Sequence, residues 1–137
     1  RGLIEDGFPA KNILLVGVRN SDKKETAFLK KHNIRQISIQ NLNDNIEDFC
    51  DGIMAFANGK ELYVSIDIDV FDPVFAPSTE LLEQGGFTSR QFIYLIQRIN
   101  KMRNLRAVDI VEINSEKDKQ NNNFTVRLGA KILAELL

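Results

Sequence analysis

Cysteine and histidine are almost absent from this sequence. Its 137 residues contain one cysteine, Cys50, and one histidine, His32. A single cysteine excludes a framework of internal disulfides and favours a reducing compartment, so we expect a cytoplasmic protein. His32 stands beside Asn33 near the end of a predicted helix and belongs to no motif. We therefore interpret it as a surface or helix-capping residue.

Long apolar runs and an excess of one charge are also lacking. No stretch approaches the ~18 apolar residues of a membrane span, and the first residues resemble neither a signal nor a transit peptide. The formal net charge of −1 offers no attraction to nucleic acid or to an anionic membrane, so we expect neither as a partner. With 43% hydrophobic and 27% charged residues, the composition is that of an ordinary globular domain.

Short apolar runs alternate with helical patterns along the whole chain. This alternation predicts an α/β fold with a mainly parallel sheet and helices on both faces, in one domain without an internal linker. The continuous apolar run NILLVGV predicts a strand buried on both faces. We expect strands over residues 12–18, 35–39, 62–68 and 105–113. We expect helices over residues 22–32, 43–59, 88–102 and 125–137.

Local signals define several boundaries. Asp22 with Glu25, and Thr88 with Gln91, have the spacing of capping boxes at helix starts. The polar run EKDKQNNN, residues 116–123, predicts a surface loop. Gly129 lies inside the last predicted helix, where glycine costs ~1 kcal/mol relative to alanine, which suggests close packing there.

The stretch SIDIDVFDP, residues 65–73, places Asp67 and Asp69 at the end of a predicted buried strand. Side chains two apart on a strand point to one side, and two nearby carboxylates repel unless a proton or cation lies between them. A hard divalent ion such as Mn²⁺ or Mg²⁺ would relieve the repulsion, whereas the alternative is that both aspartates simply cap the following loop. Asp72, before Pro73, is more typical of a turn whose carboxylate binds backbone amides.

The fourth predicted strand repeats this arrangement, with Asp109 inside the run AVDIVEIN and Glu112 near its end. Glu112 would share an edge of the sheet with Asp67 and Asp69 if the two strands are neighbours. A carboxylate there could bind a planar guanidinium group through two hydrogen bonds. Taken alone, Glu112 is better explained as an ordinary acid at a strand end that accepts hydrogen bonds from loop amides.

Together these segments resemble the ureohydrolase family of arginases and agmatinases. SIDIDVFDP matches every fixed position of its Ser-x-Asp-x-Asp-x-x-Asp-Pro signature, and DIVEIN, residues 109–114, matches its Asp-[Ile/Val]-Val-Glu-[Ile/Val]-Asn segment. Ala76-Pro77 and GGFT, residues 85–88, match further elements at the right distance. The resemblance covers essentially the whole chain and corresponds to the C-terminal half of a family member.

The resemblance implies a hydrolase with the three-layer α/β/α fold. Asp67 and Asp69 would be ligands of a two-manganese centre, with Asp67 as the bridging carboxylate. The metal pair would activate water for attack on a guanidinium carbon, and Glu112 would hold that group. The products would be urea and an amine, and the complete protein would form trimers or hexamers.

The sequence departs from the family pattern in two places. The Gly-Gly-Asp-His and Asp-Ala-His-x-Asp elements, which supply the remaining ligands, are not present in these 137 residues. We therefore expect the isolated chain to be inactive. In the loop at the substrate site Thr79 is kept, with an expected role in substrate binding, but Glu80, Leu81 and Leu82 replace Gly, Thr and Pro.

We therefore expect part of a manganese-dependent enzyme that acts on a small guanidino compound, with agmatine slightly favoured over arginine. The altered loop leaves a second hypothesis, a non-catalytic regulatory or assembly subunit with the same fold. A sugar-nucleotide transferase with an Asp-x-Asp motif is a third, but it would leave DIVEIN without a role.

Overall fold

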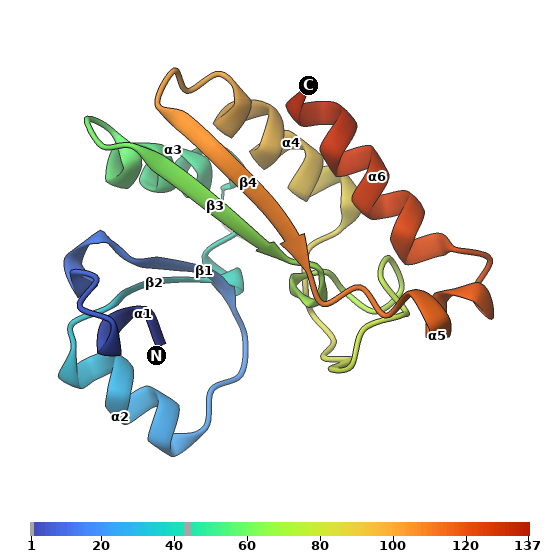
Figure 1. Cartoon of the computed structure of the whole chain (residues 1–137), viewed down its shortest axis with the longest axis horizontal. Coiled ribbons are helices and arrows are strands. Elements are labelled where there is room, and N and C mark those ends of the chain that lie inside the picture. The colour runs from blue at the N-terminus through green and yellow to red at the C-terminus, as the bar shows by residue number, and fades with distance from the viewer. Residues whose placement is uncertain (1, 43–44) are drawn as a thin grey trace.

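A computed structural model describes residues 2–42 and 45–137. In this part of the chain, strands and helices alternate as expected (Figure 1). The strands are Leu14–Val18 (β1), Arg35–Ser38 (β2), Leu62–Asp67 (β3) and Leu105–Val111 (β4). The α-helices are Gly2–Glu5 (α1), Lys23–Lys31 (α2), Ile46–Ala57 (α3), Ser89–Asn100 (α4), Ser115–Lys119 (α5) and Phe124–Leu136 (α6). Three 3₁₀ turns are Ala10–Asn12 (η1), Ile39–Leu42 (η2) and Ile68–Val70 (η3).

The strands form two separate parallel pairs. β1 pairs with β2 and β3 pairs with β4, and within the described residues no ladder joins one pair to the other. Both pairs have the crossover helix that parallel strands require, α2 between β1 and β2 and α4 between β3 and β4. The α/β class with parallel pairing is therefore confirmed.

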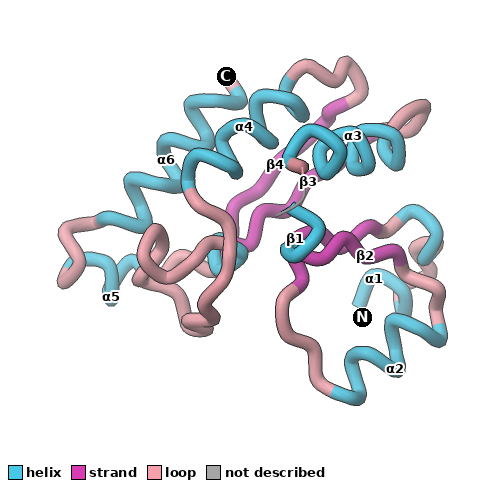
Figure 2. The backbone as a smooth tube through the Cα atoms, turned by 180° about the vertical axis from the view of Figure 1, so that it is seen from behind, coloured by secondary structure: helices cyan, strands magenta, loops and turns pink. Residues whose placement is uncertain are grey.

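Helices α3, α4 and α6 lie on one face of the β3–β4 pair, as the view from behind shows (Figure 2). The burial of β3 alternates accordingly, with Ile66 3% exposed and Tyr63 58% exposed. No described helix covers the face that carries Tyr63, which is turned toward the viewer in Figure 1. Among the described helices, none combines the length and the apolar character needed to cross a membrane.

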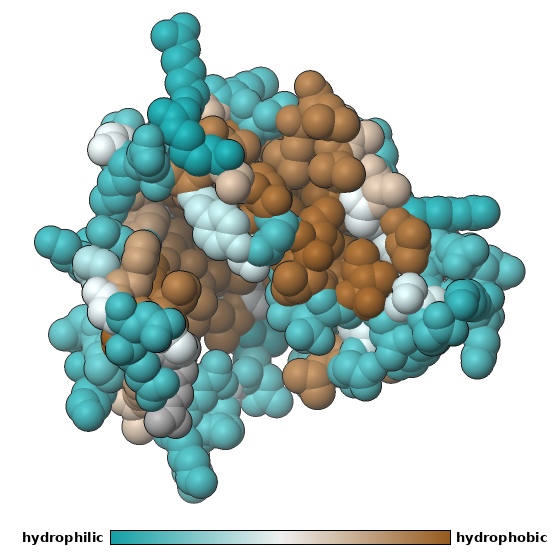
Figure 3. Space-filling view, viewed as in Figure 1, coloured by the Kyte–Doolittle hydropathy of each residue, from teal (hydrophilic) through white to brown (hydrophobic). Residues whose placement is uncertain are grey.

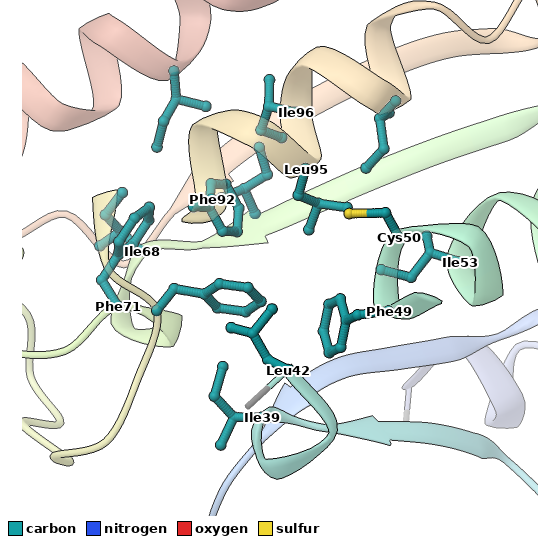
Figure 4. Packing of buried hydrophobic residues seen from close by; sticks show 14 of the residues in the cluster. Ile39, Leu42, Phe49, Cys50, Ile53, Ile68, Phe71, Phe92, Leu95 and Ile96 are labelled. Atoms are coloured by element: carbon teal, nitrogen blue, oxygen red, sulfur yellow. The ribbon is translucent and has the colours of Figure 1, made fainter. Parts of the chain in front are cut away.

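A continuous apolar core joins the two strand pairs through α3 and α4 (Figure 4). The rings of Phe87 and Phe92 meet edge to face with centroids 5.3 Å apart, and Phe49 meets Phe87 in the same way at 5.7 Å. Each such pair contributes roughly 0.5–1.5 kcal/mol beyond its buried area. Cys50 is fully buried in this core, and burial raises the pKa of its thiol.

The predicted helix boundaries are mostly confirmed, because capping is local. The Asp22 carboxylate accepts a hydrogen bond from the Glu25 amide at 2.7 Å, and Thr88 and Gln91 form a reciprocal capping box. His32 is the C-cap of α2, as expected. The expected start of α3 at residue 43 lies outside the described residues; the described helix begins after its N-cap, Asn45.

The prediction of a surface loop over residues 116–123 is wrong. Residues Ser115–Lys119 form α5, and the Asp118 side chain is fully buried. Its two carboxylate oxygens accept hydrogen bonds from the amides of Thr125 at 3.0 Å and Val126 at 2.8 Å, at the first turn of α6. Asp118 thus supplies acceptors to amides that the helix itself leaves unpaired.

The close packing predicted for Gly129 is confirmed. A Cβ at this position would lie 2.9 Å from Cδ1 of Ile113, in the segment that follows β4. Glycine therefore lets α6 lie close to the chain that leaves the strand.

Candidate active site

The acidic motif lies where β3 ends. Asp67 is the last residue of the strand and the N-cap of η3, and its carboxylate accepts a hydrogen bond from the Asp69 amide at 3.1 Å. Asp69 therefore lies in a 3₁₀ turn rather than on the strand. The prediction that both side chains point to one side of a strand therefore does not apply, because the strand ends at Asp67 and the backbone turns after it. The short turn nevertheless keeps both acids at the carboxyl edge of the sheet.

The titration of Asp69 is perturbed by its surroundings. Burial of Asp69, and then the nearby Asp67 carboxylate, raise the pKa of Asp69 from 3.8 to about 6, although Arg19 opposes the shift. Glu112 acts in the same direction as Asp67, which places its charge close to Asp69 as well. A partly buried acid among like charges is the electrostatic setting that a bound cation would relieve.

Arg19, which follows β1, holds the turn that carries Asp69. Its two terminal nitrogens donate to the backbone carbonyls of Asp69 and Val70, both at 2.6 Å. The guanidinium fork thus fixes two successive peptide groups, which a lysine could not do in the same geometry. The sequence analysis did not identify Arg19. Its contact with the turn joins residues about fifty positions apart, and no local sequence pattern indicates such a contact.

The loop after η3 is fixed by Asp72, as predicted. Its carboxylate accepts hydrogen bonds from the amides of Val74 at 3.1 Å and Gly85 at 2.9 Å. These bonds lower the pKa of Asp72. Gly86 lies against the same backbone, because a Cβ there would be 2.4 Å from the carbonyl carbon of Phe71. Only glycine allows the two ends of the loop to approach this closely.

Glu112 directly follows β4, beside the acidic turn. Asp67 and Val111 are register partners in the parallel pair, so the expectation that Glu112 shares the carboxyl edge with Asp67 is confirmed. Glu112 has φ +65°, in the left-handed region that non-glycine residues rarely adopt. Such strain is tolerated where the surroundings fix the backbone, and it often accompanies functional positions. Glu112 also lines a shallow pocket together with Glu80, Ile113, Asn114, Ser115 and Glu116.

Asp109 has a different role from the acids at the sheet edge. It accepts a hydrogen bond from the hydroxyl of Tyr63, on the neighbouring strand, and this bond lowers the pKa of the carboxyl group. The two side chains lie on the face of the β3–β4 pair that no described helix covers. The cross-strand register brings them together, and the sequence alone did not identify the pair.

The loop containing Thr79 is packed against α5. Thr79 is 1% exposed; its hydroxyl donates to the Leu81 carbonyl at 2.9 Å, and its own carbonyl accepts from Lys117 Nζ at 2.8 Å. Glu80 accepts a hydrogen bond from the Asn114 side chain at 2.6 Å. In this structure Thr79 stabilises the loop, and its role in substrate binding stays a prediction.

Within residues 2–42 and 45–137 there is no group of three or more His, Cys, Asp or Glu side chains arranged to hold a metal ion. Asp67 and Asp69 supply carboxylate oxygens, the donors that hard divalent ions prefer. Two carboxylates do not complete the coordination of such an ion. A metal centre here would therefore need ligands from outside the described chain.

The sequence was compared with known families. The sequence profile described as "Arginase family" matches residues 1–137. The chain belongs to the arginase family. Membership confirms the resemblance on which the interpretation of the DIVEIN and SIDIDVFDP segments was based, although the roles of the individual site residues stay predictions.

Relatives in the arginase family are considerably longer than this chain. An arginase of Staphylococcus aureus is 27% identical over 116 residues, which are 82% of this chain and 38% of the relative. The "Arginase, non-hepatic 2" of Xenopus laevis is 32% identical over 126 residues, or 84% and 35% of the two chains. The solved proclavaminate amidino hydrolase of Streptomyces clavuligerus is 25% identical with a TM-score of 0.86, covering 99% of this chain and 44% of its own. The chain thus spans less than half the length of these relatives.

Proposed function

We propose that this chain is the C-terminal part of a manganese-dependent ureohydrolase, which hydrolyses a small guanidino compound to urea and an amine. One observation carries the proposal: Asp67, Asp69 and Glu112 lie at one edge of a parallel sheet, where the register of β3 and β4 makes the two strand ends neighbours. Ligands of open parallel sheets bind beyond the carboxyl ends of the strands. Family membership agrees with this placement.

Asp67 and Asp69 would hold the metal ions. The fit is supported by the raised pKa of Asp69, which reflects burial and repulsion that a cation would offset. When bound, two Mn²⁺ ions would supply an activated water for attack on the guanidinium carbon. The remaining ligands would come from outside these 137 residues, so we expect this chain alone to be inactive.

Glu112 would bind the substrate. Its carboxylate follows β4 in a fixed, strained backbone conformation next to the acidic turn. A carboxylate held in this way can accept two hydrogen bonds from a guanidinium group and favour its charged form. Arg19 and Asp72 would act indirectly, by fixing the turn and the loop on either side of Asp69.

The substrate would be arginine or agmatine, or a close analogue of either. We further propose that the complete protein is cytoplasmic and forms trimers or hexamers.

The test is urea release by the complete polypeptide in the presence of Mn²⁺. Glu112→Gln should lower kcat/KM by roughly 100-fold or more, since a neutral amide cannot stabilise the guanidinium charge. Glu61→Gln is the matched control, because Glu61 is exposed, precedes β3 and is paired with Arg106. Unchanged activity of the Glu112 variant would contradict the assigned role.

A non-catalytic subunit is the second candidate, and one observation favours it. Leu81 and Leu82 are 71% and 50% exposed in the loop that borders the substrate position. Exposed apolar side chains are more typical of a contact surface than of a site for a charged substrate. A complete polypeptide that folds and binds Mn²⁺ but releases no urea would support this candidate over the enzyme.

A further inference from the structure

The loop that contains Thr79 is joined to the segment after β4 beside Glu112. The Asn114 amide donates to the Ser78 carbonyl at 3.0 Å, and the Asn114 side chain donates through Nδ2 to the Glu80 carboxylate at 2.6 Å. Glu80 and Glu112 consequently line the same shallow pocket, which has a volume of about 340 Å³. Two loops thus bring two carboxylates to one place at the carboxyl edge of the sheet.

We propose that Glu80 is a specificity-determining residue of the guanidino site. Its negative charge favours substrates that carry a second positive charge besides the guanidinium group, such as agmatine. The same charge disfavours substrates whose tail carries a carboxylate, such as arginine. The inference rests on the proposed function, in which Glu112 binds the guanidinium group, and it names the class of substrate that this site selects.

The first argument is that Asn114 fixes the position of the Glu80 side chain. As the N-cap of α5, Asn114 accepts a hydrogen bond through Oδ1 from the Lys117 amide at 2.9 Å. Only the oxygen of a side-chain amide can accept such a bond, so its NH₂ group is left to donate to Glu80. Glu80 uses Oε1 alone in the described hydrogen bonds, and Oε2 is therefore available to a ligand.

The second argument is that the backbone before Glu80 is fixed as well. Ser78 and Thr79 are buried, and the Ser78 amide donates to Oγ1 of Thr125 at 3.0 Å. The Thr79 carbonyl accepts from Lys117 Nζ at 2.8 Å. A carboxylate on a backbone held in this way loses little conformational freedom when a ligand binds.

The third argument is the charge of the pocket. Glu80, Glu112 and Glu116 line it, and among the described residues no basic side chain does so. Glu116 is paired with Lys119 at 2.7 Å, which leaves the other two carboxylates to a ligand. Figure 3 shows hydrophilic side chains gathered over α5, beside this pocket. One guanidinium group offsets only one of the two charges, whereas a dication offsets both.

The sequence makes Glu80 a particular property of this chain. Glutamate stands here where the arginase family pattern has glycine, so a protein that follows the pattern has no side chain at this position. The donor that holds Glu80 belongs to DIVEIN, a segment that does match the family. A carboxylate at position 80 therefore finds its hydrogen-bond partner already in place.

The experiment compares agmatine with arginine on the complete polypeptide with Mn²⁺, in the wild type and in Glu80→Gln. Isothermal titration gives the dissociation constants, and urea release gives kcat/KM. We expect the wild type to prefer agmatine and Glu80→Gln to lower the agmatine-to-arginine ratio by about 10-fold, because the interaction of exposed charges is weakened by water. The wild-type preference should also decline as the ionic strength is raised.

Two further variants control for the charge itself. Glu61→Gln removes the same charge from an exposed residue before β3, at the opposite end of the strand, and should change the ratio by less than about 2-fold. Glu80→Asp keeps the charge and should keep most of the preference for agmatine.

A wild type that prefers arginine, or a ratio that is the same in Glu80→Gln and the wild type, would overturn the inference. If urea release depends on Glu112 while the ratio ignores Glu80, the inference fails and the proposed function stands. If the two ligands bind with a ratio that depends on Glu80 but no urea is released, the proposed function fails and the selection by Glu80 stands. Absence of binding by both ligands would overturn both.

Discussion

The Arg19 guanidinium donates to the carbonyl of Asp69 at 2.6 Å and so connects the end of β1 to the acidic turn after β3. A second bond of the same length reaches the Val70 carbonyl. These are the described hydrogen bonds that tie the first strand pair to the turn with the proposed metal ligands. The position of Asp69 therefore depends on a residue about fifty positions away.

Replacing Arg19 should make the turn that carries Asp69 less stable. We expect Arg19→Ala to lower the free energy of unfolding by about 2 kcal/mol, because two carbonyls lose charge-assisted donors. Arg127→Ala is the matched control, since Arg127 is exposed on α6 and should change stability by less than about 0.5 kcal/mol. Urea denaturation of both variants measures the difference, and equal midpoints would contradict the role given to Arg19.

Gly86 offers a sharper steric test. A Cβ at this position would lie 2.5 Å from both the Asp72 amide nitrogen and the Val70 carbonyl oxygen, which are backbone atoms and cannot turn aside. We expect Gly86→Ala to destabilise the fold by about 3 kcal/mol, measured by thermal or urea unfolding.

Gly52→Ala is the control for this substitution. Gly52 lies inside α3, and a Cβ there would meet only Cδ1 of Ile37 at 3.8 Å, an ordinary contact. Alanine should therefore raise stability by roughly 0.5–1 kcal/mol through helix propensity. Loss of stability in both variants to the same extent would contradict the steric explanation.

Asp118 should make the free energy of unfolding depend on pH in the acidic range. Burial by itself would raise the pKa of Asp118, but hydrogen bonds from Val126, Ser78 and Thr125 outweigh it and hold the pKa below its ordinary value of 3.8. A depressed pKa stabilises the fold above the unfolded-state value, and this contribution is lost as pH falls through the folded-state value.

We therefore expect the free energy of unfolding to fall as the pH is lowered below about 4. Asp118→Asn should be less stable at pH 7 by about 1–2 kcal/mol and should show a weaker decline in acid. Urea unfolding at several pH values measures both. The same decline in the wild type and the variant would assign the acid sensitivity to other carboxylates.

The strained backbone of Glu112 predicts a conflict between stability and function. A left-handed conformation costs a non-glycine residue roughly 1–2 kcal/mol, so Glu112→Gly should raise the free energy of unfolding by up to about 1 kcal/mol after the entropy of glycine is included. Glu112→Gln keeps the strain and should leave stability unchanged. A fall in stability on Glu112→Gly, in unfolding by urea, would show that the side chain itself stabilises the strand end.

The sequence predicted those parts of the fold that local interactions determine. The cap at Asp22, the capping box of Thr88 and Gln91 and the turn at Asp72 each involve residues close in the chain, and each is confirmed. Parallel pairing followed from the alternation of strands and helices. The placement of Glu112 beside Asp67 followed from parallel pairing.

Features that depend on tertiary contacts were not predicted. Asp118 stands in a polar run, and only its contacts with the start of α6 show that it is buried. The partnership of Tyr63 with Asp109 depends on the register of two strands. The half-burial of β1 contradicts the expected burial on both faces, because β1 pairs with β2 alone among the described strands.

The buried position of Cys50 has a practical consequence for spectroscopy. Its thiol is fully shielded and has a raised pKa, so maleimides and spin labels will not reach it in the folded chain. A cysteine introduced on the surface, for example at Val74, would then be the single labelled site. A probe at that position could report on its surroundings without first removing the native thiol from the core.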